Sequence, residues 1–383
     1  MTAGWAVHRL PRGLHPVAWW LWALGLAVAA SRTTNPLLLG SILAVASWVV
    51  LARRTDAPWA RAFRFYLLAA ALVVALRVLF RVVFGSGGGG AVLVPLPQVP
   101  LPDWVSGVTL LGDITAEALL GGLYDGLRLA TMLVCLGAAN ALANPRRLLR
   151  SMPPALHEVS TAVVVALSVF PQLAESLVRV RRARRLRPQA DAGRVRALLG
   201  TVVPVLEDAL DRSLLLAASM DSRGYGRRGD RSRREVGVTG GLLVAGLGGI
   251  CVGLYALLDQ TTPPYLARPV LLAGVAVASL GLLLSGRGVQ RTAYRPDSWR
   301  LPELAVVACG LAAARVVWLA ARHDPTAMYP SVSPPVWPSL PLAALLGVLV
   351  ALLPAWLAPP PETLGEAATA PRPTRREVQE ALS

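Results

Sequence analysis

Long apolar segments that recur along the chain constrain its fold more than any other feature. A helix needs about 20 mainly apolar residues to cross the hydrocarbon core of a bilayer, and segments near that length follow one another with short polar connections. Charged residues make up only 16% of the 383 residues, whereas soluble domains average about 25%. We therefore predict an all-α, polytopic integral membrane protein, with membrane helices at 16–30, 36–51, 65–84, 115–140, 236–258, 269–285, 304–321 and 340–357.

The positive charge of the chain comes from arginine alone. The net charge is +16, the basic residues number 38, and none of them is lysine. A phosphate-binding loop of the Walker type and Schiff-base catalysis both need lysine, so neither is expected here. Any ATP that drives this protein would be hydrolysed by another subunit. The apolar segments also lack HExxH, GxSxG and paired-carboxylate motifs, and we expect a non-catalytic protein.

Cysteine and histidine show no metal-binding pattern. The cysteines lie singly in apolar segments without a CxxC pair, and the histidines are scattered near expected helix ends. Structural zinc sites need such ligands at short, repeated spacing, so we expect no metal site and no cofactor. The cysteines are Cys135, Cys251 and Cys309, and the histidines are His8, His15, His157 and His323.

The distribution of arginine predicts the orientation in the membrane, because cytoplasmic loops carry the positive excess. With the N-terminus in the cytoplasm, the arginine clusters at 53–64, 146–150, 179–234 and 287–300 all lie on that side. This holds only if the apolar segment 159–178 does not cross completely. We therefore predict that 159–178 is a tilted or partly embedded helix that returns to the cytoplasm.

The same pattern divides the chain into four regions. We predict N-terminal membrane helices in 1–150, a partly embedded helix and cytoplasmic coupling helices in 151–235, and C-terminal membrane helices in 236–358. The tail 359–383 is rich in proline, alanine and charge, which is typical of disorder. The glycine run from Gly85 and the prolines up to Pro102 predict a loop.

An amphipathic helix is predicted between Arg194 and Met220. Apolar residues recur there at helical spacing, namely Val195, Leu198, Leu199, Val202, Val203, Leu206, Leu210, Leu214 and Ala217. Pro204 is expected to kink this helix or to split it in two. Gly224 and Gly226 are suitable helix stops, which would leave Arg223 exposed at the helix end.

The residues around this helix resemble a known family. The run from Pro204 to Tyr225, with PVLEDALDRS followed by ASMDSRGY, resembles the signature of the transmembrane (T) component of energy-coupling factor transporters, which include the cobalt-type membrane subunits. Phe170-Pro171 and Glu175 followed by RARR at 182–185 are similar to the segment with the first Ala-Arg-Gly motif, although Arg185 replaces the glycine. The run from Gly112 to Glu117, leading to Arg128, resembles the upstream membrane helix.

The resemblance covers roughly residues 10–260 and implies a location and partners. It implies a bacterial plasma membrane protein that carries two arginine motifs at the ends of crossed cytoplasmic coupling helices. These motifs insert into two ABC-type ATPase subunits, while a separate membrane S component captures a vitamin or a transition-metal ion. By resemblance, Arg184 and Arg223 contact the ATPases, and their flanking residues are Ala183, Arg185, Ser222 and Gly224. With arginine at 185, the first coupling helix is expected to continue to Arg187.

Several charged residues in the predicted membrane helices leave an alternative open. Arg77 and Arg81 lie in 65–84, and Asp113, Glu117, Asp125 and Arg128 lie at or in 115–140. Intramembrane charges are candidates for an ion path, as in a stand-alone secondary transporter. We favour pairing of Arg77 or Arg81 with a carboxylate of the next helix, or of Asp125 with Arg128. The arginine run 179–187 has no aromatic interleaving, which disfavours nucleic-acid binding and suits contact with the lipid bilayer.

Overall fold

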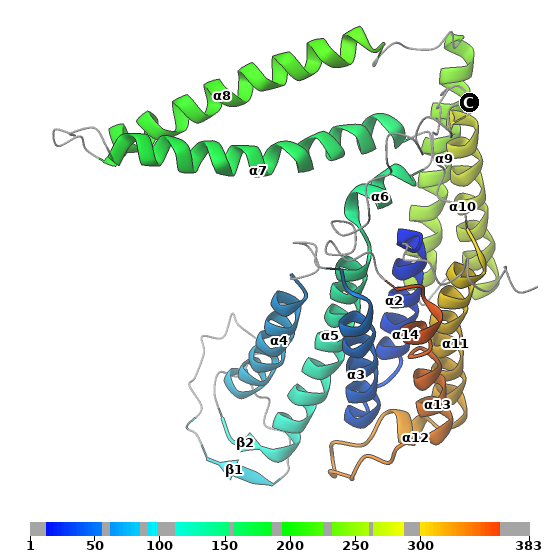
Figure 1. Cartoon of the computed structure of the whole chain (residues 1–383). Coiled ribbons are helices and arrows are strands. Elements are labelled where there is room, and N and C mark those ends of the chain that lie inside the picture. Colours follow the sequence, from blue (N-terminus) through cyan, green and yellow to red (C-terminus); the bar gives the residue numbers. More distant parts are fainter. Residues whose placement is uncertain are drawn as a thin grey trace, which may run out of the picture. The chain divides into compact units, whose positions relative to one another are not determined.

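The computed structural model describes residues 13–55, 62–84, 91–95, 97, 112–152, 156–185, 194–224, 232–259, 263–286 and 299–360 (Figure 1). Nearly all regular structure in these residues is helical, and seven of the described helices are long and apolar enough to cross a membrane. This confirms the predicted all-α, polytopic class.

The chain forms two compact units, and the first one joins both ends of the sequence. Unit 1 comprises Met1–Leu148 together with Asp297–Ser383, and unit 2 comprises Leu149–Pro296. The helices of unit 1 are α2 (Pro16–Ser31), α3 (Pro36–Arg53), α4 (Phe63–Val83), α5 (Ala116–Leu142), α11 (Leu301–His323), α12 (Pro325–Met328), α13 (Leu342–Val350) and α14 (Pro354–Leu357). The helices of unit 2 are α7 (His157–Arg185), α8 (Arg194–Ser222), α9 (Arg233–Leu258) and α10 (Pro264–Gly286), and the short α6 (Pro145–Arg150) lies at the boundary in sequence.

Local signals in the sequence explain where the membrane helices begin. The Asn35 side chain accepts hydrogen bonds from the amides of Leu37 and Leu38, and Pro36 occupies the first helical position of α3. Proline suits that position because its missing N–H would have no partner there. Thr115 caps α5 in the same way. At α9, Ser232 and Glu235 form a reciprocal capping box.

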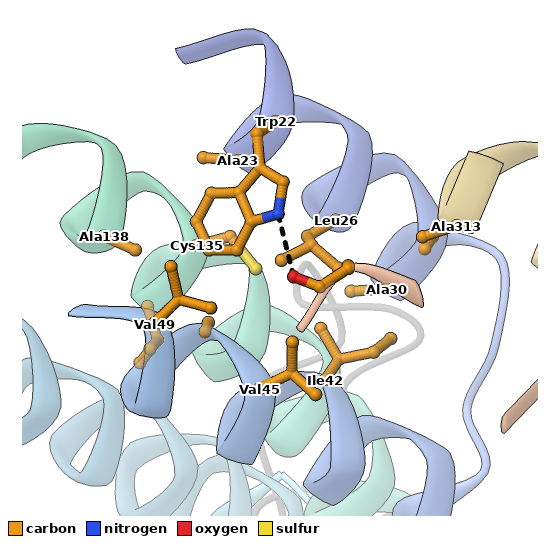
Figure 2. Close-up of a cluster of buried hydrophobic side chains, with 14 of the residues drawn as sticks. Trp22, Ala23, Leu26, Ala30, Ile42, Val45, Val49, Cys135, Ala138 and Ala313 are labelled. Carbon is orange, nitrogen blue, oxygen red and sulfur yellow. Dashed lines mark hydrogen bonds between the residues drawn. The ribbon is translucent and has the colours of Figure 1, made fainter. Parts of the chain in front are cut away.

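The core of unit 1 forms around Trp22, which is fully buried. Figure 2 shows its indole among side chains from α2, α3, α5 and α11, with its N–H donating to the carbonyl of Ala351 at 3.1 Å. Next to it, α2 and α11 are in backbone contact, because a Cβ placed on Gly25 would lie 2.4 Å from the Gly310 carbonyl oxygen. Small residues allow this close approach in membrane helices. Helix α11, which comes from the C-terminal part of the chain, is therefore an integral part of the N-terminal core.

The predicted helix at 340–357 is wrong in its extent. The structure has the nine-residue α13, a turn at 351–353 and the short α14. Pro354 explains the break, because proline inside a helix lacks an N–H and clashes with the carbonyl four residues earlier. Hydrogen bonds from α2 and α3 also stabilise this region. Trp22 of α2 donates to the Ala351 carbonyl in the turn, and Arg53 Nε of α3 donates to the Ala355 carbonyl of α14 at 2.9 Å. At about 13 Å, α13 is too short to span a bilayer.

The loop predicted from Gly85 to Pro102 contains a short strand. Strand β1 (Val92–Val94) pairs antiparallel with β2 (Ile114–Thr115), which directly precedes α5. The pairing joins residues about 20 apart in the sequence, and proline-rich composition gave no sign of it. The glycines at 85–90 and the predicted tail beyond residue 360 lie outside the described residues.

In unit 2, α9 and α10 form a closely packed antiparallel pair (Figure 1). A Cβ added to Gly246 would lie 2.4 Å from the backbone nitrogen of Ala278, and one added to Gly253 would lie 2.6 Å from the Cα of Leu271. The two backbones therefore touch at several levels, as small residues permit in membrane helices.

Candidate functional site

The two helices that the sequence analysis singled out, α7 and α8, form an antiparallel pair in unit 2 (Figure 1). Each has 29 residues, which corresponds to a length of about 43 Å. The chain runs from α7 into α8 through 186–193, which lie outside the described residues. Helix α8 continues through Pro204 without interruption, so the predicted split at this proline does not occur.

The two helices are joined by the carboxylate of Asp208 on α8. The buried Ser176 on α7 donates a hydrogen bond to it, and Arg212 Nε, on α8 itself, donates a second one at 3.0 Å. These two hydrogen bonds, helped by the positive charges of Arg212 and Arg179, lower the pKa of Asp208 below its ordinary value. The charged carboxylate is therefore the stable form where α7 and α8 meet.

The contact at Asp208 sets the spacing between the two predicted motifs. Arg184 is eight residues beyond Ser176, and Arg223 is 15 residues beyond Asp208. At 1.5 Å per residue, the two arginine positions lie about 12 Å and about 22 Å from the contact along their helices. Since the helices run in opposite directions, the arginines stand at opposite ends of the pair, about 34 Å apart along it.

The end of α8 has the geometry predicted for the second motif. The helix ends at Ser222, the Arg223 amide donates to the Met220 carbonyl at 3.1 Å, and the Gly224 amide donates to the Asp221 carbonyl at 2.9 Å. Gly224 has a φ of +75°, a left-handed conformation that glycine adopts without strain. This turn stops the helix and leaves Arg223 exposed at its tip.

Ser222, the last residue of α8, contributes a local hydrogen bond to this helix end. Its exposed hydroxyl donates to the Ser219 carbonyl at 2.9 Å, which satisfies one of the carbonyls that a helix terminus leaves unpaired.

At the other motif, α7 remains helical through Ala183, Arg184 and Arg185. Ala183 is exposed, whereas the side chains of the two arginines lie outside the described residues. A helical Arg185 agrees with the expected continuation of this helix, and the stretch to Arg187 is also outside the description. The roles predicted for both motifs stay predictions.

The regularly spaced apolar residues of α8 form an apolar stripe along the helix, and this stripe is exposed. Leu206 is 55% exposed, Leu210 62% and Leu214 67%, and Leu199, Val202 and Val203 are also exposed. Such a row of apolar side chains indicates a helix that contacts lipid or another protein.

By length and hydropathy, α7 does not differ from the other helices that could cross a membrane. The stretch Val159–Ala183 meets the same length and hydropathy criteria as the other six candidate spans. Its predicted tilted or partly embedded placement, and the predicted cytoplasmic side of the coupling helices, both stay predictions.

One of the expected ion pairs joins α4 to α5. Arg81 Nη2 lies 3.7 Å from Asp125 Oδ2, which confirms the predicted pairing of the third helix with the fourth. Arg128 instead donates to the carbonyl of Ser31. A cavity of about 370 Å³ adjoins the Arg81–Asp125 pair and is also lined by Glu117. One carboxylate oxygen of Glu117 has no hydrogen-bond partner among the described residues. Within the described residues, no group of three or more histidine, cysteine or acidic side chains could hold a metal ion.

The contact between Ser176 and Asp208 was missed by sequence reasoning. The spacing of Asp208 and Arg212 at i and i+4 indicates an ion pair on one helix face, but nothing in the sequence connects it to a serine 32 residues earlier. The sequence shows only that Ser176 lies close to the arginine-rich run that begins at Arg179.

Comparison with known protein families supports the resemblance. The family model for CbiQ, described as cobalt transport protein, matches residues 7–235. The match includes α2 to α8 and ends at the start of α9, so α10 to α14 lie beyond it. No curated protein matches the chain.

Proposed function

Because the chain belongs to the CbiQ family of cobalt transport proteins, we propose that it is the transmembrane coupling subunit of an ATP-driven energy-coupling factor importer. In this role it transmits conformational changes of two ABC-type ATPase subunits to a membrane S component that binds the cargo. The family makes cobalt the first cargo to test, and other transition-metal ions and vitamins are the further candidates.

The observation that carries this proposal is Arg223 at the tip of α8. A guanidinium stays charged at all physiological pH values and can bind a carboxylate of a partner through two parallel hydrogen bonds. Gly224 holds it beyond the last helical turn, where the negative end of the helix dipole favours a cation. The tip is thus suited to insert into an acidic groove of another subunit.

The antiparallel pairing supports a coupling role for both helices. Two ATPase subunits need two contact points on the membrane subunit, and α7 and α8 offer one motif at each end of their pair. The hydrogen bond from Ser176 of α7 to the charged Asp208 of α8 links the two helices, so movement of one tip is passed to the other helix. The open apolar stripe of α8 then provides a surface for the S component.

The proposal assigns no catalytic step to this chain. Its residues include no lysine, so it has no Walker-type phosphate-binding loop, and ATP hydrolysis belongs to the partner subunits. Its contribution is mechanical, as in other transitions in which packed helices slide against each other.

The decisive experiment reverses the charge of Arg223. We expect Arg223→Glu to abolish co-purification of the ATPase subunits and ATP-dependent cobalt uptake, while the protein still inserts into the membrane. The matched control is Arg234→Glu, which makes the same charge change on an exposed residue at the start of α9. A glutamate there is compatible with the helix dipole. Normal uptake and normal ATPase association in Arg223→Glu would overturn the proposal.

A second measurement separates this function from a stand-alone secondary transporter. We expect the purified chain alone to transport no cobalt in liposomes under an imposed ion gradient. Transport by the chain alone, with loss of activity in Asp125→Asn, would favour the ion path around Arg81 and Asp125 instead.

A further inference from the structure

An apolar groove with two arginines lies between α2 and α11 in unit 1. It has a volume of about 650 Å³ and opens to the outside of the helix pair. Val28 is 47% exposed and Leu311 54%, so the walls face the surroundings of the protein. The residues that line it are Val28, Arg32, Leu311, Ala312, Ala314, Arg315 and Trp318.

The basic residues gather at one end of this groove. Gly25 of α2 lies against Gly310 of α11, and the Thr33 hydroxyl after α2 donates to the carbonyl of Met328, the last residue of α12, which follows α11. The two helices therefore run in the same direction and end on the same side of unit 1. Counted from the contact of Gly25 with Gly310, Arg32 lies seven residues farther along the chain and Arg315 lies five, which places them about 10 Å and about 8 Å from that contact along the helix axes.

Trp318 draws the arginines of α11 together. The guanidinium carbon of Arg315 lies 4.7 Å from the centre of the Trp318 ring, and that of Arg322 lies 3.6 Å from it. Cation–π contacts of this kind orient a guanidinium but do not neutralise it. Arg32 and Arg315 thus line the groove, and a third arginine, Arg322, contacts the Trp318 ring that lines it as well.

The protein offers these charges no carboxylate in the part of the chain that the structure describes. The ion pairs found there are Arg81 with Asp125 and Arg212 with Asp208. Asp324, just beyond the end of α11, caps α12 by accepting from the amide of Ala327 and the hydroxyl of Thr326. Both hydrogen bonds are accepted by Oδ1, and they lower the pKa of Asp324.

An exposed arginine on a membrane helix needs a counter-charge. Helix α11 is one of the candidate spans, and Arg315 is exposed on it. A charge within a membrane helix is costly unless its long side chain reaches the headgroup region. There it can pair with the phosphate of an anionic lipid.

We propose that this groove is a binding site for one anionic phospholipid. The lipid phosphate lies among Arg32, Arg315 and Arg322, and an acyl chain lies along Val28 and Leu311. A lipid with a choline headgroup fits poorly, because the Trp318 ring that could bind its quaternary ammonium is covered by guanidinium groups. The site requires only that unit 1 is in a membrane and is independent of the coupling role.

The test uses the full chain in detergent and native mass spectrometry with phosphatidylglycerol and phosphatidylcholine of identical acyl chains. We expect the wild type to retain phosphatidylglycerol preferentially. Arg315→Gln and Arg32→Gln should each weaken its binding about fivefold, as expected for one arginine at a membrane surface. Arg64→Gln removes the same charge from an exposed site on α4 and should leave binding unchanged.

A second variant tests the groove apart from its charge. Val28→Trp fills the apolar wall while it keeps all three arginines, and it should also reduce phosphatidylglycerol retention. Unchanged binding in Val28→Trp would show that surface charge alone attracts the lipid and would overturn the proposed site. Equal retention of the two lipids by the wild type, or equal losses in Arg315→Gln and Arg64→Gln, would overturn it as well.

Discussion

Replacing Gly310 by alanine tests the backbone contact between α2 and α11, on which unit 1 depends. The added Cβ would lie 2.5 Å from the Cα of Trp22 and 2.8 Å from its carbonyl oxygen, whereas ordinary contacts begin near 3.4 Å. The helices must therefore separate by about 0.9 Å, the difference between 3.4 and 2.5 Å. Both neighbours are backbone atoms, which cannot move aside like a flexible side chain.

The cost follows from overpacking and is partly offset by helix propensity. Overpacking a well-packed core lowers the free energy of unfolding by about 1–3 kcal/mol. Because the added Cβ of Gly310→Ala meets backbone atoms, we expect a cost near the upper value, about 3 kcal/mol. Alanine gains about 1 kcal/mol over glycine inside a helix. We expect a net loss of about 2 kcal/mol, which corresponds to a decrease of about 5 °C in Tm.

Thermal unfolding in detergent, followed by size-exclusion chromatography, measures this loss. The matched control is Gly40→Ala on α3, where an added Cβ meets no atom within 4 Å. This control should gain about 1 kcal/mol, so the two alanine variants should shift Tm in opposite directions. A Gly310→Ala protein as stable as Gly40→Ala would refute the backbone contact.

Two further predictions concern Asp208 and Trp22. Because the pKa of Asp208 is lowered in the folded state, its contribution to the α7–α8 contact is present above its ordinary pKa of 3.8 and is lost as the pH falls through the lower, folded value. Amide hydrogen exchange near Ser176, corrected for the intrinsic effect of pH, should therefore increase only in that acidic range. Asp208→Asn should remove this pH dependence. The same pH dependence in the variant would contradict the contact between Asp208 and Ser176. Trp22→Phe removes the hydrogen bond to Ala351 and leaves a buried carbonyl without a donor, which should lower the free energy of unfolding by about 1–3 kcal/mol. Thermal unfolding should show a larger loss of stability for Trp22→Phe than for Trp19→Phe.

Much of the candidate site could be predicted because it depends on neighbours in the sequence. The stop of α8 needs only Gly224 after an amphipathic run, and the exposure of Arg223 follows from that stop. The pairing of Arg81 with a carboxylate of α5 was also predicted, since a charge in an apolar helix needs a partner. Which carboxylate it contacts was left open, because several acidic residues lie near or in α5 and only packing selects Asp125.

The amino-acid sequence by itself determined the class of the protein, the extents of most helices and the family, because apolar length, caps and short motifs act over a few residues. Tertiary structure alone decided the union of α11 with the N-terminal core, the link from Ser176 to Asp208 and the basic groove at Trp318. The physical reason is that the sequence of a membrane helix specifies which residues are apolar, small or charged. Which helix meets which face depends on close packing between segments that are far apart in the chain.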